Sequence, residues 1–123
     1  DKDGWLDIVT GNIREANVIY FGDKDFSFSR KHILGSPEES TYHLLVTDLD
    51  GDDQLDIVTG NNGSPCAVYF NQDNAKQFDH QALSEESYST YQVAVGKING
   101  DNFPDIILAN SDHLNLYYLY RKR

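Results

Sequence analysis

The chain has 123 residues, 39% of them hydrophobic and 12% aromatic, a composition that excludes a disordered chain and allows one domain with a buried core. Its formal net charge of -10 argues against binding to nucleic acid, because phosphate contacts require clustered lysine and arginine side chains. No apolar run approaches the roughly 20 residues that a membrane-spanning helix needs, so we expect no membrane insertion.

Short apolar and β-branched runs follow one another along the whole chain. Asn, Gly, Asp, Ser and Pro separate these runs, as turns between strands require, and no stretch shows the period of about 3.6 residues that marks a helix. The sequence therefore predicts about ten strands and no helix. In chain order, the expected strands are residues 6–11, 18–21, 28–34, 42–47, 55–60, 67–70, 78–83, 91–95, 105–109 and 116–120.

The chain contains an internal repeat. The segment LDIVTGN at residues 6–12 recurs letter for letter at residues 55–61 and loosely at residues 104–110, with an offset of 49 residues each time. The segment STY at residues 40–42 recurs at residues 89–91 with the same offset. A repeat of this length with four short strands is typical of a β-propeller blade. We therefore expect an all-β fold, a partial β-propeller of about two and a half four-stranded blades with 49-residue repeats.

The expected blades form a single segment that covers residues 1–123. It divides into a blade part at residues 1–41, a full blade at residues 42–90 and a blade part at residues 91–123. Propellers commonly close a ring with roughly four to eight blades. We therefore expect this chain to be completed by further blades, either from a longer chain or by self-association.

An aspartate-rich loop precedes the strand expected at residues 55–60. Calcium takes roughly six to eight oxygen ligands, and oxygens at alternate positions of a tight loop can converge on one ion. Clustered carboxylates also repel one another unless a cation lies between them. The loop therefore predicts a Ca²⁺ site. Its expected ligands, at loop positions 1, 3, 5, 7 and 9, are the side chains of Asp48, Asp50, Asp52 and Asp56 and the backbone carbonyl of Gln54.

The residues of this loop disfavour other kinds of metal site. An EF-hand would need glycine and glutamate where the chain has Asp53 and Thr59. Zinc is disfavoured because the loop contains no histidine or cysteine, and magnesium because it prefers fewer protein ligands and more water.

Two sister loops lie 49 residues before and after this one. The third loop has Lys97 at its first position, where an ammonium group could substitute electrostatically for the ion. The first position of the first loop would lie before residue 1. We expect both to be weaker sites, with candidate ligands Asp1, Asp3 and Asp7 in the first loop and Asn99, Asp101 and Asp105 in the third.

The pattern Asp48-x-Asp-Gly-Asp-x-x-x-Asp56 followed by Ile-Val resembles the FG-GAP, or VCBS, repeat of integrin-α-like β-propellers. The resemblance covers essentially the whole chain. It implies a propeller of about seven blades, calcium in the blade loops, and an extracellular, cell-surface or periplasmic setting. It also implies that the five residues named for the middle loop are the calcium ligands.

Three hypotheses for the function remain open. The first is a calcium-stabilised binding or adhesion module without catalysis of its own, which contacts a protein or carbohydrate ligand; Trp5, Tyr88 and Tyr91 are candidates for stacking on sugar rings. The second is an accessory or catalytic portion of a secreted polysaccharide-active enzyme. The third is a purely structural or oligomerising scaffold. Scattered histidines and the absence of a catalytic motif favour the first.

The single cysteine, Cys66, lies in an apolar run. We expect it to be a buried structural thiol and not a nucleophile.

Overall fold

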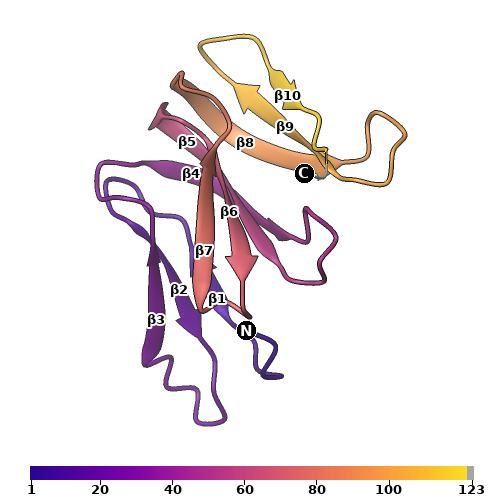
Figure 1. Ribbon diagram of the computed structural model, residues 1–123. Coiled ribbons are helices and arrows are strands. Elements are labelled where there is room, and N and C mark those ends of the chain that lie inside the picture. The colour runs from indigo at the N-terminus through magenta and orange to yellow at the C-terminus, as the bar shows by residue number, and fades with distance from the viewer. Residues whose placement is uncertain (122–123) are drawn as a thin grey trace.

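The computed structural model describes residues 1–121, which form ten strands and no helix (Figure 1). Each strand expected from the sequence is present, with ends that differ by a few residues. None of the described residues forms a helix long and apolar enough to cross a membrane. The strands are β1 (Ile8–Thr10), β2 (Asn17–Phe21), β3 (Arg30–Leu34), β4 (Thr41–Thr47), β5 (Asp56–Ser64), β6 (Ala67–Gln72), β7 (Gln77–Ala82), β8 (Tyr88–Gly96), β9 (Asp105–Asn110) and β10 (Leu116–Tyr118).

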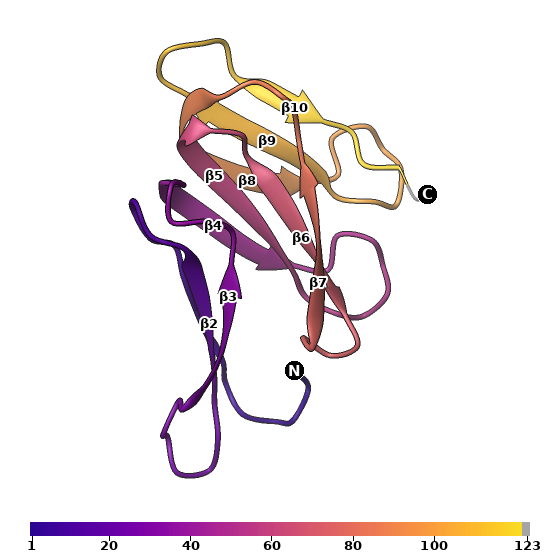
Figure 2. The same ribbon diagram turned by 60° about the vertical axis from the view of Figure 1, so that its left-hand side comes forward.

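The strands pair antiparallel in three groups that follow the chain order. Strands β1, β2 and β3 form the first group, β4 to β7 the second, and β8 to β10 the third. The far end of β5 also pairs with β8, which joins the second and third groups into one sheet. Figures 1 and 2 show that the result is a curled sheet and not a flat layer.

The second and third groups begin in the same way. In β4, Thr41 pairs with Asn61 and the register shifts before the next pair. In β8, Thr90 pairs with Asn110 and the register again shifts before the next pair. Each group therefore starts with a β-bulge at the same place in its first strand.

Two hydrophobic clusters lie on opposite faces of the β4 to β7 group. Ile57 and Tyr69 face the cluster shared with the first group, whereas Val58 and Val68 face the cluster shared with the third. Burial on both faces explains the apolar runs at residues 57–58 of β5 and 67–70 of β6, which show no polar alternation. Cys66 belongs to the second cluster and is 4% exposed, which confirms the expected buried thiol.

Glycine allows neighbouring groups to approach closely. A Cβ atom added at Gly60 in β5 would lie 2.7 Å from Cγ2 of Val93 in β8. A Cβ atom added at Gly11 would lie 3.0 Å from Cγ2 of Thr41 in β4. The glycine that ends each IVTG segment therefore leaves room for the first strand of the next group.

Buried polar side chains fix the starts of β4 and β8. The hydroxyl group of Thr41 donates to Asn61 Oδ1 at 2.8 Å and accepts from Asn17 Nδ2 at 2.8 Å. The hydroxyl group of Thr90 donates to Asn110 Oδ1 at 2.6 Å. Because these buried groups are satisfied, the network holds both bulged strand ends in defined positions.

Candidate metal centre

The aspartate loop connects β4 to β5. Asp48 organises it by accepting two backbone hydrogen bonds, from Gly51 N at 2.7 Å and from Asp53 N at 3.0 Å. Gly51 and Asp53 have φ angles of 77° and 66°, the left-handed conformation that a tight turn of this kind uses. Side-chain bonds to nearby amides are the usual way in which aspartate stabilises a turn.

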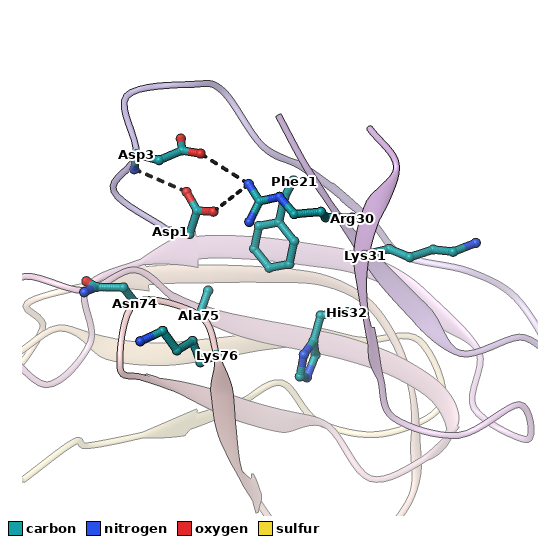
Figure 3. A pocket seen from close by; sticks show the side chains of 9 residues that line it. All are labelled: Asp1, Asp3, Phe21, Arg30, Lys31, His32, Asn74, Ala75 and Lys76. Carbon is teal, nitrogen blue, oxygen red and sulfur yellow. Dashed lines mark hydrogen bonds and ion pairs between the residues drawn. The ribbon is translucent and has the colours of Figure 1, made fainter. Parts of the chain in front are cut away.

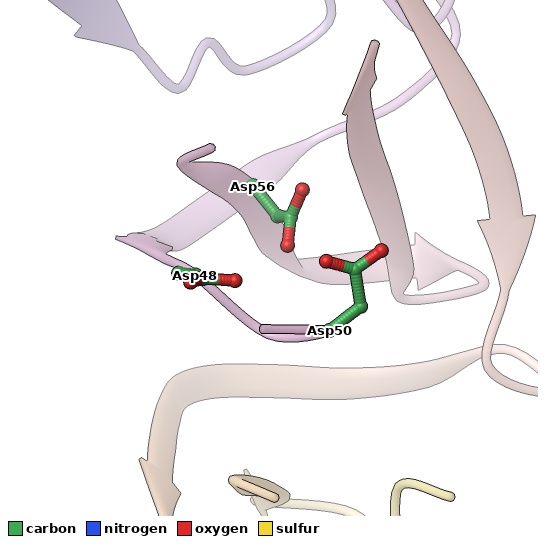
Figure 4. A group of neighbouring side chains, drawn as sticks. All are labelled: Asp48, Asp50 and Asp56. Carbon is green, nitrogen blue, oxygen red and sulfur yellow. The ribbon is translucent and has the colours of Figure 1, made fainter. Parts of the chain in front are cut away.

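Three carboxylates converge in this loop (Figure 4). One oxygen each from Asp48, Asp50 and Asp56 lies within 4.8 Å of the others. Asp48 and Asp50 come from the loop, while Asp56 is the first residue of β5. This set offers only hard oxygen donors, which suit calcium, magnesium or manganese better than zinc or copper. The three residues could therefore hold one hard cation.

The protein environment disfavours negative charge on two of these carboxylates, those of Asp50 and Asp56. Burial raises the pKa of Asp56 to about 6, although hydrogen bonds from the Asn71 and Leu49 amides oppose the shift. Burial and the nearby charge of Asp52 raise the pKa of Asp50. A cation between these groups would offset both costs, so the arrangement fits a bound metal ion.

Asp52 and Gln54 lie outside the group of three. Asp52 accepts hydrogen bonds from the backbone N and the side-chain Nε2 of Gln54, both at 2.8 Å. Gln54 in turn accepts a bond at Oε1 from Asn74 N at 2.7 Å, which ties the loop to the connection between β6 and β7. Their roles as calcium ligands stay predictions.

Asp56 also has a structural role that sequence reasoning missed. Its Oδ2 accepts a hydrogen bond from Leu49 N at 2.8 Å, and its Oδ1 accepts one from Asn71 N at 2.9 Å. The carboxylate is buried and joins the start of the loop to β6. Asp56 therefore anchors the loop whether or not an ion is bound.

The equivalent aspartates make equivalent bonds. Asp105 accepts from Ile98 N at 2.9 Å and from Tyr120 N at 3.1 Å. Asp7 accepts from Gly22 N at 2.9 Å. A signal for this role was present in the sequence, because aspartate precedes the Ile-Val or Ile-Ile pair in all three repeats, whereas the first and third loop positions vary.

The sister loops share the backbone arrangement of the middle loop but not its charges. Asp1 and Asn99 each accept a hydrogen bond from the amide two residues later, at 3.2 and 3.0 Å, as Asp50 does at 3.2 Å. Among residues 1–121, the middle loop is the place where three side chains of the types His, Cys, Asp or Glu meet closely enough to share one ion. The ligand roles predicted for the first and third loops stay predictions.

The predicted aromatic candidates lie in different surroundings. Tyr91 is 53% exposed and packs edge to face against Tyr42, with ring centroids 5.2 Å apart and an interplanar angle of 88°. Tyr88 lies against His113, and Trp5 lines an apolar cleft between the first two groups of strands. Sequence reasoning missed Tyr42, although it occupies the same place in the repeat as Tyr91.

An all-β chain with repeated strand groups, in which an acidic loop precedes each of the equivalent strands β1, β5 and β9, belongs to the class of β-propeller-like repeat proteins. A family model described as FG-GAP-like repeat matches residues 1–59 and, a second time, residues 48–108. The chain therefore belongs to the FG-GAP-like repeat family. No curated protein and no solved structure matches it in comparison.

Proposed function

We propose that this chain is part of a calcium-stabilised β-propeller that acts as a binding or adhesion module outside the cytoplasm, in an extracellular, cell-surface or periplasmic setting. Membership of the FG-GAP-like repeat family supports this proposal, because such repeats typically occur in extracellular proteins. In this proposal β4 to β7 are one complete blade of a 49-residue repeat, and the other two groups are parts of neighbouring blades.

Calcium has a structural role in this proposal. Asp48, Asp50 and Asp56 would hold the ion, with Asp52 and the carbonyl of Gln54 as further predicted ligands. The ion would supply positive charge between the carboxylates and so tie the loop to β5. An affinity of roughly 10⁻⁴ to 10⁻³ M suffices for such a site, because extracellular calcium is abundant.

One observation carries the binding role, namely the exposed pair Tyr42 and Tyr91. Both are the extra residue of a β-bulge, and bulges re-aim side chains away from the strand ladder. The neighbouring Thr41 and Thr90 are buried and hydrogen-bonded, which holds the bulges rigid. Rigidly held, exposed tyrosines are frequent in binding surfaces because they lose little conformational entropy on binding.

Ligand screening with matched variants tests the binding role. We expect the wild-type chain to bind at least one oligosaccharide on a glycan array or one protein on an array of extracellular proteins. Tyr91→Ala should weaken that binding at least tenfold without lowering the melting temperature by more than a few degrees. Tyr117→Ala removes an exposed ring on β10 and should leave binding unchanged. Equal losses in both variants would contradict a role for the Tyr42–Tyr91 pair.

We also propose that the chain has no catalysis of its own. Support comes from its histidines, whose rings or nitrogens are already in contact with other groups. A reducing-sugar assay on a panel of polysaccharides tests this, and any turnover above that of the heat-denatured chain would contradict it. The contacts are His32 with Phe78, His80 with Tyr69, His113 with Tyr88, and His43 Nδ1 with Val93 N.

Further blades are the partners that we propose for the cleft between the first two strand groups. The cleft has a volume of about 600 Å³ and a mainly apolar lining that includes Leu6 and Leu55. Between the second and third groups, Leu45 and Leu49 of β4 and its loop fill the corresponding place. A strand equivalent to β4, from a longer chain or another copy, would therefore fit. Light scattering distinguishes the two alternatives, since only a strand from another copy of the chain gives a mass that rises with protein concentration.

A further inference from the structure

A guanidinium group lies against the first aspartate loop (Figure 3). Nη2 of Arg30, on β3, lies 3.1 Å from Asp1 Oδ2 and 3.3 Å from Asp3 Oδ2. The same nitrogen lies 3.4 Å from the carbonyl oxygen of Gly22, and the guanidinium carbon lies 5.2 Å from the centre of the Phe21 ring. Two carboxylates, a carbonyl and an aromatic face therefore hold this cation in place.

Arg30 stands beside the positions that correspond to ligands of the middle loop. Asp1 lies 49 residues before Asp50, and the two make the same backbone hydrogen bond at the same length of 3.2 Å. The residue 49 positions after Arg30 is Asp79, which is exposed and carries the opposite charge. Within residues 1–121, no lysine or arginine side chain forms an ion pair with an aspartate of the middle loop as Arg30 does with Asp1 and Asp3.

The other cations near the first loop do not pair with Asp1 or Asp3. Lys2 lies within the loop, and its ammonium group forms no ion pair with the described residues. Lys76, on the other side of the same pocket, pairs with Asp73 and not with the loop. Lys31 points away from the loop in Figure 3. Arg30 is therefore the side chain that neutralises Asp1 and Asp3.

We propose that Arg30 takes the place of a metal ion in the first loop, so that this loop is stabilised without calcium while the middle loop requires it. The comparison with the middle loop rests on the function proposed above. A guanidinium group is always ionised, so it competes with a divalent cation at every physiological pH. Its charge repels an approaching ion, and its hydrogen bonds occupy the carboxylate oxygens that the ion would need.

The test follows two equivalent backbone amides, those of Asp3 and Asp52, by NMR while Ca²⁺ is added to ¹⁵N-labelled protein. In the wild type, we expect the Asp52 amide to shift with calcium and the Asp3 amide to stay unchanged. In Arg30→Gln, the Asp3 amide should also shift, and calorimetry should count one more bound ion than in the wild type. Arg30 is half-exposed, so the variant should keep the wild-type fold, which the dispersion of its other amide signals checks.

Lys31→Gln is the matched control, because it removes the same charge one residue away and should behave like the wild type. The proposal is overturned if the wild-type Asp3 amide responds to calcium in the same concentration range as the Asp52 amide. It is also overturned if the Asp3 amide of Arg30→Gln does not respond. If the Asp52 amide of the wild type does not shift with calcium, the proposed calcium site in the middle loop is contradicted. The response of the Asp3 amide in Arg30→Gln still decides the role of Arg30.

Discussion

Asp50→Asn separates charge from shape in the middle loop. Asp50 Oδ1 accepts a hydrogen bond from Asp52 N at 3.2 Å, which an asparagine oxygen can also accept. The carboxylate oxygens of Asp48, Asp50 and Asp56 lie within 4.8 Å of one another, a distance at which two unit charges repel by roughly 3 kcal/mol at an effective dielectric constant of about 20 and roughly 1 kcal/mol in water. Because Asp48 and Asp50 are only partly buried, we expect the ion-free variant to be roughly 1 kcal/mol more stable than the wild type.

Calcium should reverse the order of stability of the wild type and Asp50→Asn. A ligand present at about 100 times its dissociation constant stabilises the folded state by about 2.7 kcal/mol, which about 10 mM calcium reaches for a site of about 10⁻⁴ M. For a chain of this size, that gain corresponds to a rise in melting temperature of about 10 °C. Asp50→Asn lacks one ligand charge, so it should lose most of this gain and become less stable than the wild type in calcium.

The assay is thermal unfolding followed by circular dichroism in EDTA, in CaCl₂ and in MgCl₂. Asp25→Asn provides the control, because it removes an exposed carboxylate that lies between β2 and β3 and should keep the full calcium gain. Magnesium should give a smaller rise than calcium. If Asp50→Asn is less stable than the wild type in EDTA and still gains about 10 °C from calcium, the electrostatic reasoning for this loop is wrong.

Two further predictions concern the pH dependence and the close approach of the strand groups. In EDTA, the free energy of unfolding should fall by roughly 1–3 kcal/mol as the pH rises from about 4 to about 6. Folding raises the pKa of Asp56 from 3.8 to about 6, so in this range the folded chain holds a proton that the unfolded chain has released. Urea titrations at several pH values measure this fall, and Asp56→Asn should lack it. Gly60→Ala should cost roughly 1–3 kcal/mol in urea unfolding, because the added Cβ would lie 2.7 Å from Val93 Cγ2. Gly96→Ala meets no atom within 4 Å and should be nearly neutral, so equal effects of the two alanines would contradict the close-packing argument.

The strands were predictable from the sequence because the same order of apolar runs and turn residues occurs in successive repeats. Apolar runs such as 57–58 and 67–70 mark strands that are covered on both faces, and the structure buries them as expected. The length of β5 was not predictable. It extends to Ser64 because Asn62 and Ser64 pair with β8, and this contact comes from a strand that begins 24 residues after Ser64. The hydrophobic pattern within β5 does not indicate that a distant strand will pair with its end.

The candidate site was predictable to the extent that it depends on alternation along one loop. The spacing of Asp48, Asp50 and Asp56 predicts their convergence, and the structure brings them together. The hydrogen bonds that turn Asp52 toward Gln54, and the approach of Arg30 to the first loop, depend on side-chain geometry and on a neighbouring hairpin. Spacing within a loop says nothing about groups that arrive from other strands.

The middle loop as a calcium site is the central claim, and a crystal structure of the chain grown with calcium tests it most directly. We expect an anomalous difference peak in this loop, with carboxylate oxygens of Asp48, Asp50 and Asp56 about 2.3–2.6 Å from the ion. Crystals grown with about 10 mM calcium, above the expected dissociation constant, that show no peak between these three carboxylates would contradict the account.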